Sequence, residues 1–191
     1  MQIKKADIST QEARTLFFQD GALDLIAGAT LLNFGFDVLS QSPSSSLFTW
    51  VPILLFSSLK NRNTLPRLTP YLKNASDKQL RIWTLIPSFG LALMLVLLGI
   101  IMLSDALSLA DLRFALGFSL IALLALVPAL WVGQKQFFIY AAVAFAAGLL
   151  SLFIAMPALF IFITAAVMLF FGGRAMMRFS REFVLDEEKD R

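Results

Sequence analysis

Long apolar blocks run through this 191-residue chain, and their length constrains the fold more than any other feature. A transmembrane α-helix needs about 20 consecutive, mostly apolar residues. The chain is 58% hydrophobic and only 15% charged, whereas about one quarter of the residues in a soluble domain are charged. We therefore predict an all-α protein built as a polytopic transmembrane helical bundle.

Polar breaks divide the apolar sequence into six candidate crossings. These are Phe17–Leu39, Leu47–Leu59, Ile82–Leu103, Phe114–Val132, Phe137–Ile154 and Ala158–Phe171. The second block is short and contains Pro52. A re-entrant second segment, which would leave five crossings, is therefore an alternative to six.

The distribution of Lys and Arg separates these alternatives, because basic residues gather in cytoplasmic loops. With six crossings and a cytoplasmic N-terminus, the outer side receives only Arg113 of the sixteen Lys and Arg residues. With a re-entrant second block, the basic loop at 60–81 would lie outside and this asymmetry would be lost. We therefore predict six helices with both termini cytoplasmic. The expected regions are an N-terminal segment at 1–16, a six-helix domain at 17–171 with its basic cytoplasmic loop at 60–81, and a charged tail at 172–191.

The chain contains neither Cys nor His. A thiol nucleophile, a His general base and a Cys/His metal site are therefore excluded. The acidic spacing after Asp20 also lacks the second acidic cluster of the CDP-alcohol phosphotransferases, and no Gly-rich phosphate loop is present. We predict that the protein is not an enzyme and has no catalytic residue, metal or cofactor, and that it does not bind nucleic acid.

The first apolar block carries four polar side chains that a membrane helix would not be expected to tolerate: Asp20, Asp24, Asn33 and Asp37. In one continuous helix, Asp20 and Asp24 lie one turn apart on the same face. A stripe of small residues on that side of the helix favours the close approach of a neighbouring helix. The stripe consists of Gly21, Gly28 and Gly35.

Three roles for the acidic residues are compatible with the sequence. In the first, they dock the helix by pairing with Arg67, Arg81 or Arg174. In the second, Asp24 is a protonatable or cation-binding group, since intramembrane carboxylates are commonly functional. In the third, they contact a partner. Asp37 is expected at the outer mouth, where it needs no partner inside the bundle.

The remaining polar segments are predicted to lie at the cytoplasmic surface. The loop Lys60–Arg81 carries six basic residues and one acid, a composition that suits contact with anionic headgroups. The tail is basic near the last apolar block and acidic beyond it. We expect the tail to extend the last helix, with Arg174 and Arg178 reaching toward the headgroups.

Three short stretches of the chain resemble an uncharacterised family of bacterial polytopic inner-membrane proteins. The first is an aromatic-x-D-G-x-x-D opening, met by Phe18, Asp20, Gly21 and Asp24. The second is a P-R loop at Pro66 and Arg67, followed by Tyr71. The third is the segment GGRAMMRF, which leads to an acidic end. The resemblance implies a multi-pass protein of the bacterial cytoplasmic membrane and assigns no catalytic or binding residue.

Two functions remain open from the sequence. The leading hypothesis is an integral membrane protein that serves as an accessory or scaffold component of a membrane assembly, in contact with lipid and with a membrane-protein partner or further copies of itself. The alternative is a small cation- or proton-coupled transporter, or a substrate-binding membrane subunit, that uses Asp24.

Overall fold

The computed structural model describes residues 10–40, 55–68, 77–103, 110–154 and 156–183. These residues form helices, with turns at 19–21, 133–134 and 152–154, and contain no strand. The elements are α1 (Thr10–Phe18), α2 (Ala22–Ser40), the π-helix η2 (Lys60–Thr64), α4 (Leu65–Leu68), α5 (Asp77–Leu103), α6 (Ala110–Val132), α7 (Lys135–Ser151) and α8 (Pro157–Glu182).

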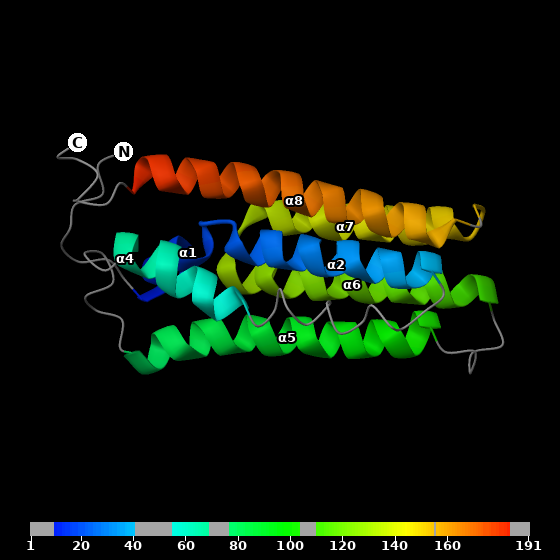
Figure 1. Ribbon diagram of the computed structural model, residues 1–191, viewed down its shortest axis with the longest axis horizontal. Helices are drawn as coiled ribbons and strands as arrows, with labels where there is room; N and C mark the ends of the chain where they lie inside the picture. The colour runs from blue at the N-terminus through cyan, green and yellow to red at the C-terminus, as the bar shows by residue number, and fades with distance from the viewer. Residues whose placement is uncertain (1–9, 41–54, 69–76, 104–109, 155, 184–191) are drawn as a thin grey trace.

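The long helices lie side by side as an elongated bundle (Figure 1). Helices α2, α5 and α7 begin at one end of the bundle, and α6 and α8 return to it. Helices α1 and α4 lie at that same end. In the described part of the chain, the most extensive helix pairs are α2 with α8 and α6 with α7.

Four of the described helices contain a segment long and apolar enough to cross a membrane. These segments are Ala22–Ser40, Lys78–Leu98, Phe114–Val132 and Pro157–Glu182. Helix α7 is also apolar, but its 17 residues extend only about 25 Å at 1.5 Å per residue. Most of the predicted second crossing, Leu47–Leu59, falls outside the described residues.

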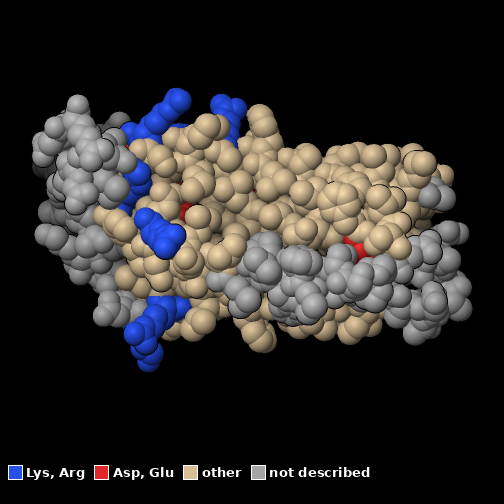
Figure 2. All heavy atoms as spheres, viewed as in Figure 1, with Lys and Arg blue, Asp and Glu red and all other residues tan. Residues whose placement is uncertain are grey.

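The charge and hydropathy of the surface are consistent with a membrane environment. Large apolar side chains are exposed on the outer faces of the long helices, among them Phe89, Leu130 and Phe170, and soluble monomers rarely expose extensive apolar patches. Figure 2 shows the Lys and Arg side chains gathered at the end where α1 and α4 lie. Apart from Arg113 near the start of α6, the described basic residues belong to segments at this end, which we call the basic end.

One sequence prediction about the polar segments needs correction, and another is confirmed. The predicted loop 60–81 begins as helix, because residues 55–68 are continuously helical and α5 starts at Asp77. The prediction that the tail extends the last helix is confirmed, since α8 continues beyond the apolar block Ala158–Phe171 to Glu182. Pro157 occupies the first turn of α8, where a missing backbone N–H is not costly.

The glycine stripe predicted in the first block is confirmed as a packing surface, and its neighbour is α8. A Cβ atom on Gly28 would lie 2.9 Å from the Leu169 side chain, and a Cβ on Gly35 would lie 2.6 Å from Phe162. At the basic end, a Cβ on Gly21 would lie only 2.3 Å from the carbonyl oxygen of Gly172. The two helices therefore approach closely along their length, because α2 and the turn before it lack side chains at these positions.

Gly172 and Gly173 provide a matched test of this interface, because they are neighbours in α8. A Cβ on Gly172 would lie 2.9 Å from the backbone nitrogen of Leu25, whereas a Cβ on Gly173 would meet nothing within 4 Å. We expect Gly172→Ala to destabilise the protein by about 1–3 kcal/mol through overpacking, and Gly173→Ala to have little effect. Thermal unfolding in detergent, followed by tryptophan fluorescence, measures both. Equal stability of the two variants would contradict the close contact.

Candidate functional site

The first block does not form one continuous helix, as the sequence analysis assumed. Residues 19–21 make a turn between α1 and α2, and Gly21 adopts a φ of +71° that favours glycine. Leu25 donates the first helical hydrogen bond of α2 to the carbonyl of Gly21, at 3.0 Å. The carboxylate of Asp20 accepts a hydrogen bond from the backbone nitrogen of Ala22, at 3.1 Å, and so satisfies a free donor at the helix start.

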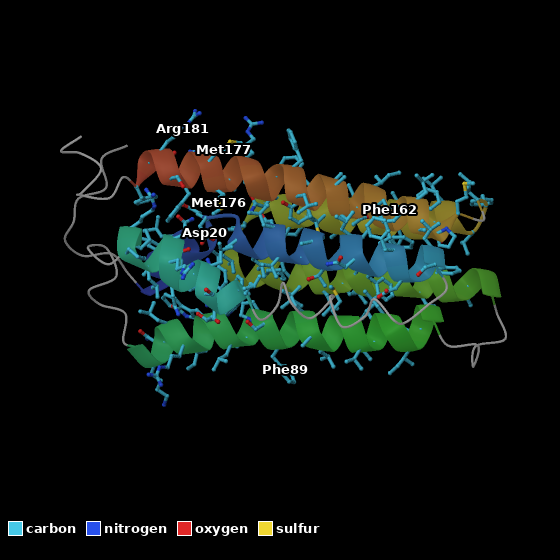
Figure 3. The ribbon with its side chains drawn as sticks, viewed as in Figure 1. Asp20, Phe89, Phe162, Met176, Met177 and Arg181 are labelled. Carbon is cyan, nitrogen blue, oxygen red and sulfur yellow. The ribbon has the colours of Figure 1, made fainter. Side chains whose placement is uncertain are left out.

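Asp20 is buried in an ion pair with Lys60, a residue expected in a solvent-exposed loop. The Lys60 ammonium lies 2.7 Å from Oδ1 of Asp20, and the two side chains are 0% and 1% exposed. The ammonium also donates a hydrogen bond to the carbonyl oxygen of Phe17. Figure 3 shows Asp20 inside the bundle near its basic end.

Aromatic rings enclose the remaining faces of the Lys60 ammonium. Its nitrogen lies 4.2 Å from the ring centre of Phe17, 5.3 Å from that of Phe18 and 5.7 Å from that of Phe56. These distances allow cation–π attraction, which is stronger when water is excluded. Burial lowers the pKa of Lys60 from its usual 10.5, while the adjacent Asp20 carboxylate acts to raise it.

The π-helix η2 brings a second donor to Asp20. The hydroxyl of Thr64 donates a hydrogen bond to Oδ2 of Asp20. Lys60 and Thr64 are the first and last residues of η2, and both are fully buried. A single-turn π-helix is often found at functional sites. Here the π-helix places Lys60 and Thr64 so that one donates to each oxygen of Asp20. Both oxygens of this carboxylate therefore have hydrogen-bond partners.

Asp24 lies one helical turn further into α2 and is only partly satisfied. The side-chain amide of Gln136, at the start of α7, donates a hydrogen bond to Oδ2 at 2.7 Å. Oδ1 is buried and has no hydrogen-bond partner in the described part of the chain. The hydroxyl of Tyr140, on α7, is also buried and has no hydrogen-bond partner in the described part of the chain.

The sequence analysis proposed that arginine residues pair with the acidic residues. This prediction is wrong for Asp20, whose ion-pair partner is Lys60. Arg67 instead donates hydrogen bonds to the carbonyls of Ser180 and Phe183, at 3.3 and 2.7 Å, near the end of α8. Such carbonyls lack partners within their own helix. The other two candidates, Arg81 and Arg174, are exposed. Arg67 therefore joins α4 to the end of α8.

The remaining polar candidates of the first block do not join the cluster. Asp37 lies thirteen residues after Asp24, or about 20 Å along the helix at 1.5 Å per residue. Its side chain is 1% exposed and lies three residues before the end of α2, so it packs within the bundle at the end opposite the polar residues near Asp20. Asn33, which lies between Asp24 and Asp37 in the sequence of α2, is partly buried. The described residues contain no group of three or more His, Cys, Asp or Glu that could hold a metal ion.

The structure thus defines a helical protein with four helices capable of crossing a membrane and a buried polar cluster at its basic end. We define this polar cluster as Asp20, Asp24, Lys60, Thr64 and Gln136. Comparison with models of protein families, with curated protein sequences and with solved structures finds no match.

The buried ion pair predicts a non-additive response to substitution. Lys60→Met leaves the Asp20 charge buried without its partner, so we expect a loss of about 3–5 kcal/mol of stability. The double variant Asp20→Asn, Lys60→Met removes both charges and keeps an oxygen for Ala22, so its loss should be smaller than the sum of the single losses. Chemical unfolding in mixed detergent micelles measures the free energy of unfolding of the wild type, the two single variants and the double variant.

The exposed pair of Arg178 and Glu182, also 2.7 Å apart, is the matched control. Its removal should change stability little, because water screens exposed charges. Additive losses at Asp20 and Lys60 would contradict direct pairing of these two side chains.

Proposed function

We propose that this chain is a multi-pass protein of the bacterial cytoplasmic membrane in which Asp24 takes up and releases a proton, in the manner of a small proton-coupled transporter or a substrate-binding membrane subunit. The observation that supports this most directly is the state of Asp24. Its side chain is 1% exposed, yet Oδ1 has no hydrogen-bond partner among the described residues.

The charge balance of the polar cluster supports a proton-binding role. Lys60 contributes one positive charge and Asp20 one negative charge, so the ion pair is neutral. An ionised Asp24 adds an uncompensated negative charge, whereas a protonated Asp24 leaves the cluster neutral. A buried, unpaired carboxylate is costly, and ionisable groups inside a membrane domain commonly mark ion or proton pathways.

The local geometry favours a proton over a metal cation. Magnesium and calcium require about six or more oxygen ligands, whereas a proton needs only one carboxylate oxygen. Oδ1 of Asp24 is unoccupied by any described donor, and Tyr140 carries a buried hydroxyl in its vicinity. Gln136 fixes the other oxygen from α7. Protonation of Asp24 would therefore alter a contact region shared by α2 and α7.

An accessory or scaffold role in a membrane assembly is the second candidate. The observation in its favour is that a cavity of about 160 Å³ between α5 and α6 has an apolar lining that does not include Asp24. Such a cavity does not suit a polar solute. In either role we propose six crossings with both termini in the cytoplasm, which would place the basic end at the cytoplasmic surface in accord with the positive-inside rule.

We expect Asp24→Asn to abolish a protonated-carboxyl band in infrared spectra of the reconstituted protein recorded as a function of pH. The amide side chain keeps an acceptor for Gln136 but cannot titrate. Asp37→Asn is the control, because Asp37 is equally buried on the same helix but far from the cluster, so a band that is lost only in Asp24→Asn belongs to Asp24. Persistence of the same band in Asp24→Asn, with the protein folded, would contradict the proton-binding role.

Purification in a mild detergent followed by native mass spectrometry distinguishes the two candidates. A protein partner present in stoichiometric amount, whose binding survives Asp24→Asn, is the result expected of an accessory subunit. A chain that purifies alone, and whose pH-driven proton uptake in liposomes is lost in Asp24→Asn but kept in Asp37→Asn, is the result expected of a proton-coupled carrier.

A further inference from the structure

A second feature of the molecule, separate from the polar cluster, is the apolar cavity between α5 and α6. It measures about 160 Å³, and α2 contributes part of its wall. Two of its lining residues, Ile86 and Val127, are 50% and 58% exposed. The cavity therefore reaches the outer surface of the bundle, at the side where α5 and α6 meet.

Proline and glycine account for the space. Pro87 and Pro128 lie inside α5 and α6, and both line the cavity. Proline within a helix removes a backbone hydrogen bond and prevents regular close packing. Gly90, one turn after Ile86, also lines the cavity, and a Cβ atom at this position would meet nothing within 4 Å. The space beside Gly90 is thus available to a guest.

The surroundings of the cavity identify the chemistry of that guest. Both helices that flank the opening contain segments able to cross a membrane, so lipid chains are the molecules that would meet it. An apolar cavity of about 150 Å³ stays dry and accepts an apolar guest the size of benzene. A comparable volume suits part of one acyl chain.

A cationic group lies next to the lining of the cavity. Trp131 lines the cavity, and the guanidinium of Arg14, from α1, lies 4.9 Å from the centre of its ring. Nε of Arg14 is buried and has no hydrogen-bond partner within the described residues. Arginine binds phosphate well because its nitrogen donors match the phosphate oxygens.

We infer that the α5–α6 cavity holds one acyl chain of an anionic phospholipid, whose phosphate binds Arg14 beside Trp131. Trp131 joins the two parts of this site, since it both lines the cavity and lies against the guanidinium. The position also agrees with the preference of tryptophan for the membrane interface. The inference does not depend on protonation of Asp24.

Native mass spectrometry of the full chain, released from nanodiscs that contain phosphatidylglycerol and phosphatidylcholine in equal amounts, tests the site. We expect the wild-type chain to retain one phosphatidylglycerol in preference to phosphatidylcholine. Arg14→Gln should reduce the amount of retained phosphatidylglycerol by about tenfold, the effect of losing a hydrogen bond to a charged group. Arg62→Gln is the control, because Arg62 is exposed on η2 and does not line the cavity.

Gly90→Leu tests the acyl-chain part of the site by filling the cavity. We expect this variant to lose the retained lipid, and we expect Gly173→Leu to keep it. Gly173 is the matched control, because a Cβ there also meets nothing within 4 Å but the residue does not line the cavity. Circular dichroism of both variants establishes that the helices are intact.

Quenching by phosphatidylglycerol with brominated acyl chains gives a second measure that needs no cavity substitution. Trp131 should be quenched more strongly than Trp83, which is 5% exposed and packs against Phe17 outside the cavity lining. Variants with a single tryptophan separate the two signals. Equal quenching, or unchanged lipid retention in Gly90→Leu, would overturn the inference. A change from dimer to monomer in Gly90→Leu would also overturn it, since the occupant would then be a second copy of the chain.

Discussion

The burial of the Lys60 ammonium against Asp20 is the interaction on which the arrangement of the basic end depends. A charged amine without water is stable only if its environment replaces the lost hydration. Asp20, the Phe17 carbonyl and three aromatic rings do so here. Meeting this requirement fixes the turn between α1 and α2 and draws the helix at 55–68 against it.

The same turn determines how α2 meets α8. Gly21 adopts a positive φ in this turn, and its Cα lies against the carbonyl of Gly172. Any side chain at either glycine would separate the helices and move Asp24, whose Cβ lies beside Gly172. The position of the partly paired carboxylate is therefore set by helix packing as well as by its hydrogen bond to Gln136.

Much of the framework was predictable from the sequence, because hydropathy and small-residue spacing act locally. The glycine stripe at Gly28 and Gly35 was correctly interpreted as a helix-packing surface. The turn at Asp20–Gly21 was missed, although an Asp-Gly pair is itself a turn signal. The long apolar block around this pair favoured the prediction of one continuous helix over the prediction of a turn.

The partners in the polar cluster were harder to predict, because they lie far apart in the chain. Lys60 follows an apolar block and precedes other charged residues, so its sequence context resembles a surface loop. Its burial depends on rings at Phe17 and Phe18, about forty residues earlier. Gln136 reaches Asp24 across 112 positions. Neither contact can be predicted from a local sequence pattern, because only the tertiary fold brings these groups together.

The helix at 55–68 touches both the beginning and the end of the described chain, and this has a consequence for synthesis. Lys60 and Thr64 bind Asp20 near the start, so this contact can form as soon as the first 68 residues have left the ribosome. Arg67, three residues later, must wait for the carbonyls of Ser180 and Phe183. The contacts of this one helix thus become possible at two different points of synthesis, the first near the N-terminus and the second only when the final helix is complete.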